Sequence, residues 1–174
     1  QKHMKTPYER NQQAATTTAS ISSGAYATDQ SLELISNEQT TIYFTLDSSA
    51  PSTSSTQYTG PISISQTTQI KFFSIDSYSN VEDVQVLDIE IDKTPPITSS
   101  SVAQGSYSNF QNIIFTTNED STTYFTTDGS VPDTNSSVFD FSFTISETST
   151  IKYFSVDSLG NRESVKSLDI IIDQ

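Results

Sequence analysis

The sequence predicts an all-β protein built from two tandem antiparallel β-sandwiches. Three observations predict this fold class: short runs in which apolar and polar residues alternate, a self-alignment at a shift of 81 positions, and the lack of any helical period. Hydrophobic residues make up only 33% of the 174 residues, so each core must be thin. A thin core suits a sandwich, in which every second residue of a strand faces water.

The strand pattern is clearest in residues 87–92. Leu87, Ile89 and Ile91 alternate with acids, which gives one apolar face and one acidic face. The copy at 168–173 keeps the apolar face. Further strands, rich in β-branched and aromatic residues, are predicted at 40–47, 61–65 and 68–76 and, in the second copy, at 121–128, 143–146 and 149–157.

An internal repeat divides the chain into two modules. At the shift of 81 positions, Gly24 falls on Gly105 and Tyr43 falls on Tyr124. About 30 positions between residues 24 and 92 are identical to their partners, which is more than chance gives even in a chain rich in Ser and Thr. The predicted modules are residues 13–93 and 94–174.

The N-terminal residues, the junction between the modules and the C-terminal end each have a distinctive sequence. Residues 1–12 are predicted to be an N-terminal extension, of the kind that a cloning junction leaves, and they hold His3, the single histidine. Pro95 and Pro96 stiffen the junction between the modules. The chain ends where a third module would begin, so we expect it to come from a longer array.

Turn chemistry separates the predicted strands. In the second module, Gly129 and Gly160 tolerate positive φ, whereas the first module carries Ser48 and Ser79 at the same positions. Either the first module avoids positive φ in these turns or it tolerates strain there. The predicted turn-capping side chains are Asp47, Asp76, Asn80, Asp128, Asp157 and Asn161.

The composition excludes several classes of function. Eight Lys and Arg against 21 Asp and Glu give a net charge of -13, which repels nucleic acid and anionic lipid surfaces. No run approaches the roughly 20 apolar residues that span a bilayer, so direct membrane insertion is not expected. Cysteine is absent, which excludes disulfides, thiol catalysis and Cys-ligated metal centres. With one histidine, placed in the extension, a histidine-based catalytic triad is not expected either.

Three short motifs of the first module occur in a fixed order. They are the aromatic turn motif of Tyr43, Phe44, Thr45, Asp47 and Pro51, the stretch from Tyr58 to Pro61, and the late turn of Asp76 and Asn80. This set resembles the chitobiase/β-hexosaminidase C-terminal-type repeat of bacterial and archaeal extracellular proteins. The second module matches at the turns but has Phe-Asp-Phe-Ser at 139–142 in place of Tyr-Thr-Gly-Pro.

The resemblance implies a fold and a general kind of role. The fold is an immunoglobulin/fibronectin-III-like antiparallel β-sandwich, once in each module. Modules of this kind resemble spacers in large surface proteins, and in glycoside hydrolases they accompany a catalytic domain without performing its chemistry. We therefore expect an extracellular, cell-surface location.

Acidic residues are the groups that could carry chemistry. A glycosidase needs two carboxyl groups at a defined separation, but the acids here lie in surface stripes and turns, so we expect neither an enzyme nor a bound cofactor. Calcium binding is the more specific hypothesis, because the ion takes about six or more oxygen ligands and carboxylates can supply them. Solvated surface acids are the favoured alternative. The candidate calcium ligands are Asp76, Asp83, Asp92, Asp157 and Asp173.

A carbohydrate ligand would need exposed aromatic rings on which to stack. The candidates are Tyr26, Tyr58, Tyr78, Tyr107 and Phe110. Tyr26 and Tyr107 are equivalent in the two modules, which favours a packing role, as we also expect for Tyr43, Phe44 and Phe73. Tyr78 lies in a predicted turn and has Leu159 as its partner, so it is the candidate ligand contact. Asn135 begins an Asn-Ser-Ser glycosylation motif.

Two functions from different classes fit these observations. The first is a non-catalytic structural or adhesive tandem-repeat segment, a stalk, spacer or wall unit of a secreted or cell-surface protein. Its partners would be neighbouring repeats of the same chain or other surface proteins. The alternative is an accessory carbohydrate-binding module of a polysaccharide-degrading enzyme, whose partner would be a glycan.

Overall fold

The secondary structure of the described residues consists of β-strands. The computed structural model describes residues 12–173, so the predicted N-terminal extension lies outside the described residues except for Gln12. No helix that could cross a membrane occurs among the described residues. The chain divides into two compact units, Gln1–Asp92 and Lys93–Gln174, called module 1 and module 2 below.

The two modules have the same series of nine strands. In module 1 these are β1 (Thr17–Ala19), β2 (Gly24–Tyr26), β3 (Gln30–Leu32), β4 (Leu34–Ser36), β5 (Thr40–Thr45), β6 (Thr56–Gln57), β7 (Ile62–Ile64), β8 (Thr68–Asp76) and β9 (Gln85–Ile91). In module 2 they are β10 (Thr98–Ser100), β11 (Gly105–Tyr107), β12 (Gln111–Ile113), β13 (Phe115–Thr117), β14 (Ser121–Thr126), β15 (Ser137–Val138), β16 (Phe143–Ile145), β17 (Ser149–Asp157) and β18 (Lys166–Ile172).

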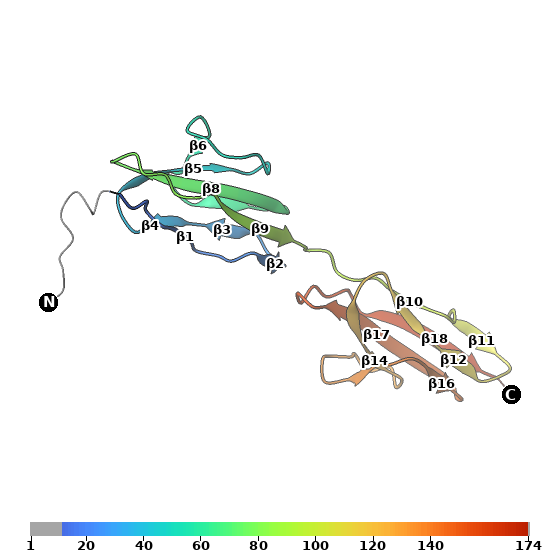
Figure 1. The fold of residues 1–174 in the computed structure, drawn as a ribbon. Helices are drawn as coiled ribbons and strands as arrows, with labels where there is room; N and C mark the ends of the chain where they lie inside the picture. The colour runs from blue at the N-terminus through green and yellow to red at the C-terminus, as the bar shows by residue number, and fades with distance from the viewer. Residues whose placement is uncertain (1–11, 174) are drawn as a thin grey trace. The chain divides into compact units, whose positions relative to one another are not determined.

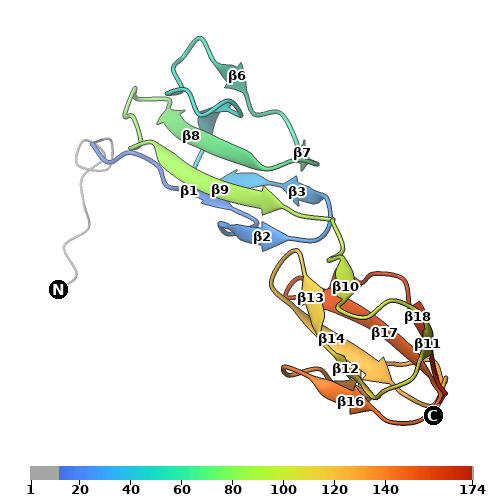
Figure 2. The same ribbon diagram turned by 90° about the vertical axis from the view of Figure 1, so that its right-hand side faces the viewer.

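Each module is a sandwich of two layers, which Figures 1 and 2 show from two sides. In module 1 one layer is a five-stranded sheet in the order β2-β9-β8-β5-β6. The other layer consists of the pairs β1–β4 and β3–β7, in which β3 and β4 are separated by Glu33 alone. Module 2 repeats the arrangement, with β11-β18-β17-β14-β15 in one layer and β10–β13 and β12–β16 in the other. The predicted tandem all-β sandwich fold is confirmed.

One strand pair in each module is parallel, although all the others are antiparallel. Gly24 and Tyr26 of β2 lie beside Ile89 and Ile91 of β9 in parallel register. In module 2, β11 pairs with β18 in the same way. The second and last strands of each module therefore run side by side in the same direction.

The long strand β8 shows why the layers adhere. Ile70 and Phe72 point into the sandwich and are 0% and 1% exposed. The core of module 1 comprises Leu32, Leu34, Ile42, Ile62, Ile64, Ile70, Phe72 and Ile89. The core of module 2 comprises Ile113, Phe115, Ile145, Ile151, Tyr153, Leu168 and Ile170. Each module thus has a hydrophobic core of its own.

Candidate functional site

A β-bulge interrupts the hairpin between β8 and β9. Phe72 pairs with Gln85, and Ile75 forms a bridge with Val81. Between these two pairs, two residues of β8 face three residues of the returning chain, which is the definition of a bulge. A bulge leaves backbone groups without their ladder partners, so another group must bond to them.

The Glu82 side chain bonds to the N–H group at this bulge. Its Oε2 accepts hydrogen bonds from the Ser74 backbone N–H at 3.1 Å and from the Ser74 hydroxyl at 2.8 Å. Its Oε1 accepts hydrogen bonds from the Thr17 backbone N–H at 2.7 Å and from Gln85 Nε2 at 2.6 Å. One carboxylate therefore joins β1 in one layer to β8 and β9 in the other. We call Glu82, Thr17, Ser74 and Gln85 the module 1 clamp.

Module 2 has the same clamp with one change. Glu163, 8% exposed, accepts hydrogen bonds from the backbone N–H groups of Thr98 at 3.1 Å and Ser155 at 2.9 Å, and from the Thr98 hydroxyl. Lys166 replaces Gln85, lies 3.2 Å from the Glu163 carboxylate and donates to the Thr98 carbonyl at 2.6 Å. The module 2 clamp of Glu163, Thr98, Ser155 and Lys166 therefore contains an ion pair, and the module 1 clamp has a neutral amide in its place.

The clamp shifts the pKa values of nearby groups. Burial acts to raise the pKa of Glu82, but the hydrogen bonds from Thr17, Ser74 and Gln85 outweigh it and lower that pKa below its ordinary value. In module 2, burial and the neighbouring Glu163 charge raise the pKa of Tyr153. Because the folded state holds Glu82 ionised, module 1 gains stability above the ordinary pKa of a glutamate and loses it as the pH falls toward the lowered value.

We expect Glu82→Gln to flatten the acid side of the stability profile of module 1. Wild-type module 1 should lose stability as the pH falls below the ordinary pKa of a glutamate, because its folded state must take up a proton on a carboxylate that accepts hydrogen bonds. The variant has no carboxyl group at position 82, so the remaining dependence of its stability on pH comes from the turn aspartates. The measurement is chemical denaturation at a series of pH values, followed by NMR signals of each module, with module 2 as the reference. Equal slopes for wild type and variant would contradict the assignment.

The late turns use an aspartate and an asparagine together. Asp76 Oδ1 accepts the backbone N–H groups of Tyr78 and Asn80, both at 2.8 Å, while Asn80 Nδ2 donates to Asp76 Oδ2 at 2.7 Å. Asp157 and Asn161 repeat this geometry in module 2. The side-chain hydrogen bond from Asn80 lowers the pKa of Asp76. At Asp157, burial acts to raise the pKa, but the hydrogen bonds from Asn161 and the turn backbone lower it.

The early turns are capped by aspartates as well. Asp47 Oδ1 accepts the Ser49 hydroxyl at 2.5 Å and the Ser49 backbone N–H at 3.1 Å, and these bonds lower the pKa of Asp47. Asp128 is bonded to Ser130 in the same way, with its pKa lowered for the same reason. Asp47, Asp76, Asp128 and Asp157 thus all hold hydrogen bonds of their own turns.

Module 1 adopts the strained alternative at its two serine positions. Ser48 has φ 68° and Ser79 has φ 65°, in the left-handed region that Gly129 and Gly160 occupy in module 2. A side chain in this region costs free energy that glycine avoids. The turns are therefore the same in both modules, and module 1 carries the strain.

We expect Ser79→Gly to raise the free energy of unfolding of module 1 by about 0.5–1 kcal/mol. Relief of the left-handed strain outweighs the greater freedom of glycine in the unfolded chain. Chemical denaturation would measure it, and Ser77→Gly in the same turn serves as the control, since Ser77 does not have positive φ. A loss of stability in Ser79→Gly would contradict the strain.

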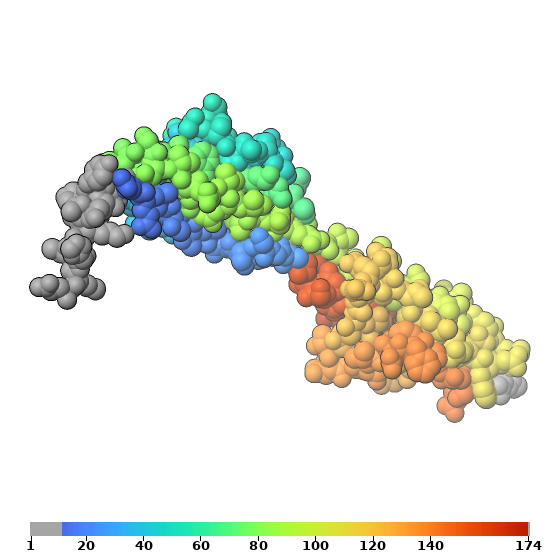
Figure 3. Space-filling model, viewed as in Figure 1, coloured from blue at the N-terminus to red at the C-terminus, as the bar shows by residue number. Residues whose placement is uncertain are grey.

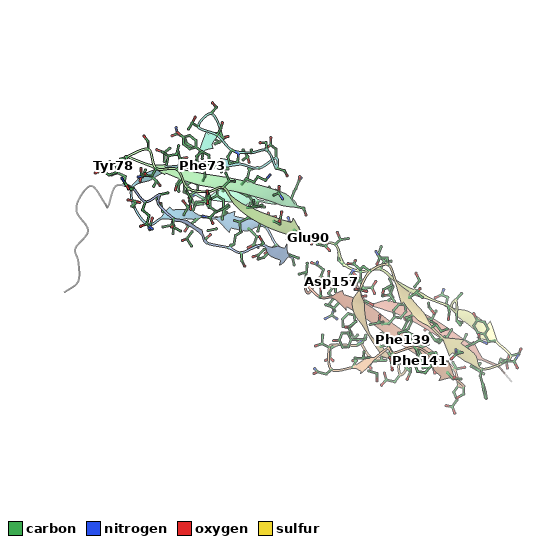
Figure 4. All side chains as sticks on the ribbon, viewed as in Figure 1. Phe73, Tyr78, Glu90, Phe139, Phe141 and Asp157 are labelled. Atoms are coloured by element: carbon green, nitrogen blue, oxygen red, sulfur yellow. The ribbon has the colours of Figure 1, made fainter. Side chains whose placement is uncertain are left out.

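The aromatic candidates fall into two groups. The hydroxyls of Tyr26 and Tyr107 donate to the carbonyls of Ser22 and Ala103, and both rings pack against the cores, as does that of Tyr58. Tyr78 is 62% exposed and lies in the turn after β8, at the end of module 1 opposite Glu90 (Figure 4). Phe110 is 56% exposed and Phe141, which the sequence reasoning did not select, is 75% exposed.

A second aromatic layer covers the outer face of each five-stranded sheet. Tyr43 stacks on Phe73 with ring centroids 5.6 Å apart, and Tyr124 stacks on Phe154 at 5.4 Å. The Arg162 guanidinium lies 3.7 Å from the centroid of the Phe154 ring. Phe73 is only 5% exposed and Phe154 is 0% exposed, so these rings pack rather than offer a stacking platform.

A shallow groove of about 710 Å³ lies on module 1. Two polar side chains of its lining bond to each other, since Gln69 Nε2 donates to Asp88 Oδ1 at 2.8 Å. Its lining residues are Ser23, Gly24, Ala25, Ser48, Thr67, Thr68, Gln69, Asp88, Ile89 and Glu90. None of them is aromatic, and the face of module 1 seen in Figure 3 has no deep hollow.

The clamp glutamates are the residues that sequence reasoning missed. The sequence predicts nearby aspartates, and not Glu82 or Glu163, as candidate ligands. A signal was present, because the two glutamates align at the shift of 81 positions and each follows the turn asparagine by two residues. Their hydrogen bonds to β1 and β10 could not be inferred, since those strands are not visible in the pattern.

Comparison with known protein families identifies the two modules. The profile of the chitobiase/beta-hexosaminidase C-terminal domain matches residues 21–86 and again residues 102–167. The chain belongs to this family, and each module contains one copy of the domain. Comparison with curated protein sequences gives no match.

The chain is also similar, at low identity, to several solved structures. Fibronectin(III)-like modules of CbhA from Clostridium thermocellum share 14% identity and a TM-score of 0.39, over 91% of this chain and 95% of theirs. The four N-terminal Ig domains of Dscam1 isoform 6.9 share 10% identity and a TM-score of 0.44, over 92% of this chain and 47% of theirs. Domains 7, 8 and 9 of the S-layer protein SbsC share 12% identity and a TM-score of 0.29, over 92% and 62%.

Proposed function

We propose that this chain is a non-catalytic spacer segment, a stalk or wall unit of a secreted or cell-surface protein, that carries tension through its modules. The observation that carries the proposal is the parallel pairing of β2 with β9 and of β11 with β18. The chain enters each module shortly before the first strand of this pair and leaves at the end of the second.

The parallel pairing determines how an applied force is distributed over the hydrogen bonds of a module. Tension on the two ends of a module pulls β2 and β9 in opposite directions along their own axes. All hydrogen bonds of the pair then bear the force together, including the bond from the Asp92 N–H to the Tyr26 carbonyl at 3.0 Å. An antiparallel hairpin pulled from its open end would instead lose its bonds one at a time.

The clamps support the same proposal. Glu82 and Glu163 fasten β1 and β10, the strands at which the chain enters each module, to the opposite layer. These entry strands have only three paired residues each. Without the clamp, tension would peel them away first.

The rival proposal is a module that binds glycans through Tyr78. A glycan array measures the difference: we expect a spacer to show no binding at micromolar concentration, with or without calcium. Micromolar binding that disappears in Tyr78→Ala, with the melting temperature unchanged, would overturn the spacer proposal in favour of an accessory carbohydrate-binding module.

A further inference from the structure

The module 1 clamp brings together a hydroxyl, a carboxylate and a carboxamide. They are the hydroxyl of Thr17 on the first strand, the carboxylate of Glu82 and the carboxamide of Gln85 on the last strand. Thr17 and Gln85 are 68 positions apart in sequence, and the Gln85 Nε2 lies 2.7 Å from the Thr17 carbonyl oxygen. A bond between them would join the two ends of the module.

The Thr17 hydroxyl is a nucleophile without a partner. Thr17 is 2% exposed, and its Oγ1 is the buried side-chain oxygen or nitrogen that has no hydrogen-bond partner among residues 12–173. In module 2 the equivalent hydroxyl of Thr98 is bonded to Glu163 and, at 2.5 Å, to the Ser155 hydroxyl. A buried hydroxyl left unpaired is unfavourable, so its position calls for an explanation.

The Glu82 carboxylate is placed to move the proton. It lies beside Thr17, whose backbone N–H it binds at 2.7 Å. The same Oε1 accepts a hydrogen bond from Gln85 Nε2 at 2.6 Å. One carboxylate can thus take a proton from the attacking hydroxyl and deliver it to the departing nitrogen, which is general acid–base catalysis at a single group.

We propose that Thr17 and Gln85 form an intramolecular ester cross-link in module 1, assisted by Glu82. The Thr17 Oγ1 attacks the Gln85 Cδ while Glu82 takes the hydroxyl proton. The tetrahedral intermediate then collapses, the Cδ–Nε2 bond breaks, and Glu82 returns the proton to the leaving nitrogen. The products are one ester bond and one ammonia molecule, and the reaction needs no oxidant, reductant or further reactant.

Module 2 is the internal control for this reaction. It keeps the hydroxyl of Thr98 and the carboxylate of Glu163 but has Lys166 where module 1 has Gln85. A lysine has no acyl carbon for a hydroxyl to attack, so module 2 cannot form the ester. The cross-link goes beyond the spacer role and does not depend on it, although it would make the load path of module 1 covalent.

Mass spectrometry of the full chain tests the proposal. We expect an intact mass lower than the sequence mass by one ammonia, and a protease digest with a joined pair of peptides that contain Thr17 and Gln85. The digest is essential, because a glutamine at a chain terminus can also release ammonia by cyclising. Treatment with hydroxylamine should separate the joined peptides, since it cleaves esters and not ordinary amides.

Matched variants locate the reaction. Thr17→Val and Glu82→Gln should abolish the joined peptides, whereas Thr98→Val in module 2 should leave them in place. The wild-type digest is decisive even if a variant fails to fold: separate, unmodified Thr17 and Gln85 peptides from folded wild-type protein would overturn the proposal. Joined peptides that persist in Thr17→Val would overturn it as well.

Discussion

Glu163→Ala is expected to lower the free energy of unfolding of module 2 by about 3 kcal/mol. The change leaves the buried N–H groups of Thr98 and Ser155 without their acceptor and removes the ion-pair partner of Lys166. Chemical denaturation, followed by NMR signals of each module, measures the loss. Module 1 in the same chain should keep its midpoint, because its core and its clamp are separate.

The control for this prediction is Asp169→Ala. Asp169 is an exposed acid on β18 that accepts one hydrogen bond from Thr150 at 2.7 Å. Its removal should change stability by no more than about 0.5 kcal/mol. If Glu163→Ala had as small an effect as Asp169→Ala, the clamp would not hold the entry strand.

Phe154→Ala is expected to have a comparable or larger effect, about 4 kcal/mol on module 2. Phe154 is completely buried on the outer face of its sheet, between the Tyr124 ring and the Arg162 guanidinium. Its loss leaves a cavity and removes both the ring stacking and the cation–π contact.

Phe141→Ala is the matched control, since it removes the same side chain from an exposed position. Phe141 is 75% exposed, and Figure 4 shows it near Phe139, which packs on the core ring of Phe115. We expect a change within about 0.5 kcal/mol, measured in the same denaturation series. Similar losses for Phe141→Ala and Phe154→Ala would mean that the outer aromatic layer does not contribute to folding.

The long strands were predictable because they are rich in β-branched and aromatic residues. β8 and β17 occupy 68–76 and 149–157, the ranges predicted from their β-branched and aromatic residues. Strict alternation would turn Phe73 toward water, although we expected a packing role for it; in the structure Tyr43 covers the ring, and β8 is buried on both faces. Packing by a neighbouring strand cannot be read from the period of one strand.

The short strands escaped prediction for a different reason. β1, β2 and their counterparts have three residues each, rich in Ser, Thr and Gly, and they are held by partners distant in sequence. The turn aspartates were recognisable because their partners lie within four residues. Glu82 was not, because its partner Thr17 is 65 positions away.

Force measurements on module 2 alone test most directly whether the modules carry tension. The chain has no cysteine, so one cysteine placed at exposed Lys93 or at exposed Glu147 gives a unique attachment point. Each variant is pulled against the C-terminal end. From Lys93→Cys the force shears β11 against β18, whereas from Glu147→Cys it opens the antiparallel pair β17–β18 from its end.

The two attachments differ in geometry and leave module 1 outside the load path. A tension-bearing module should unfold at a several-fold higher force from Lys93→Cys than from Glu147→Cys, and Glu163→Gln should lower the force in the first geometry. Equal unfolding forces in the two geometries would contradict the proposal that these modules bear load through their parallel strand pair.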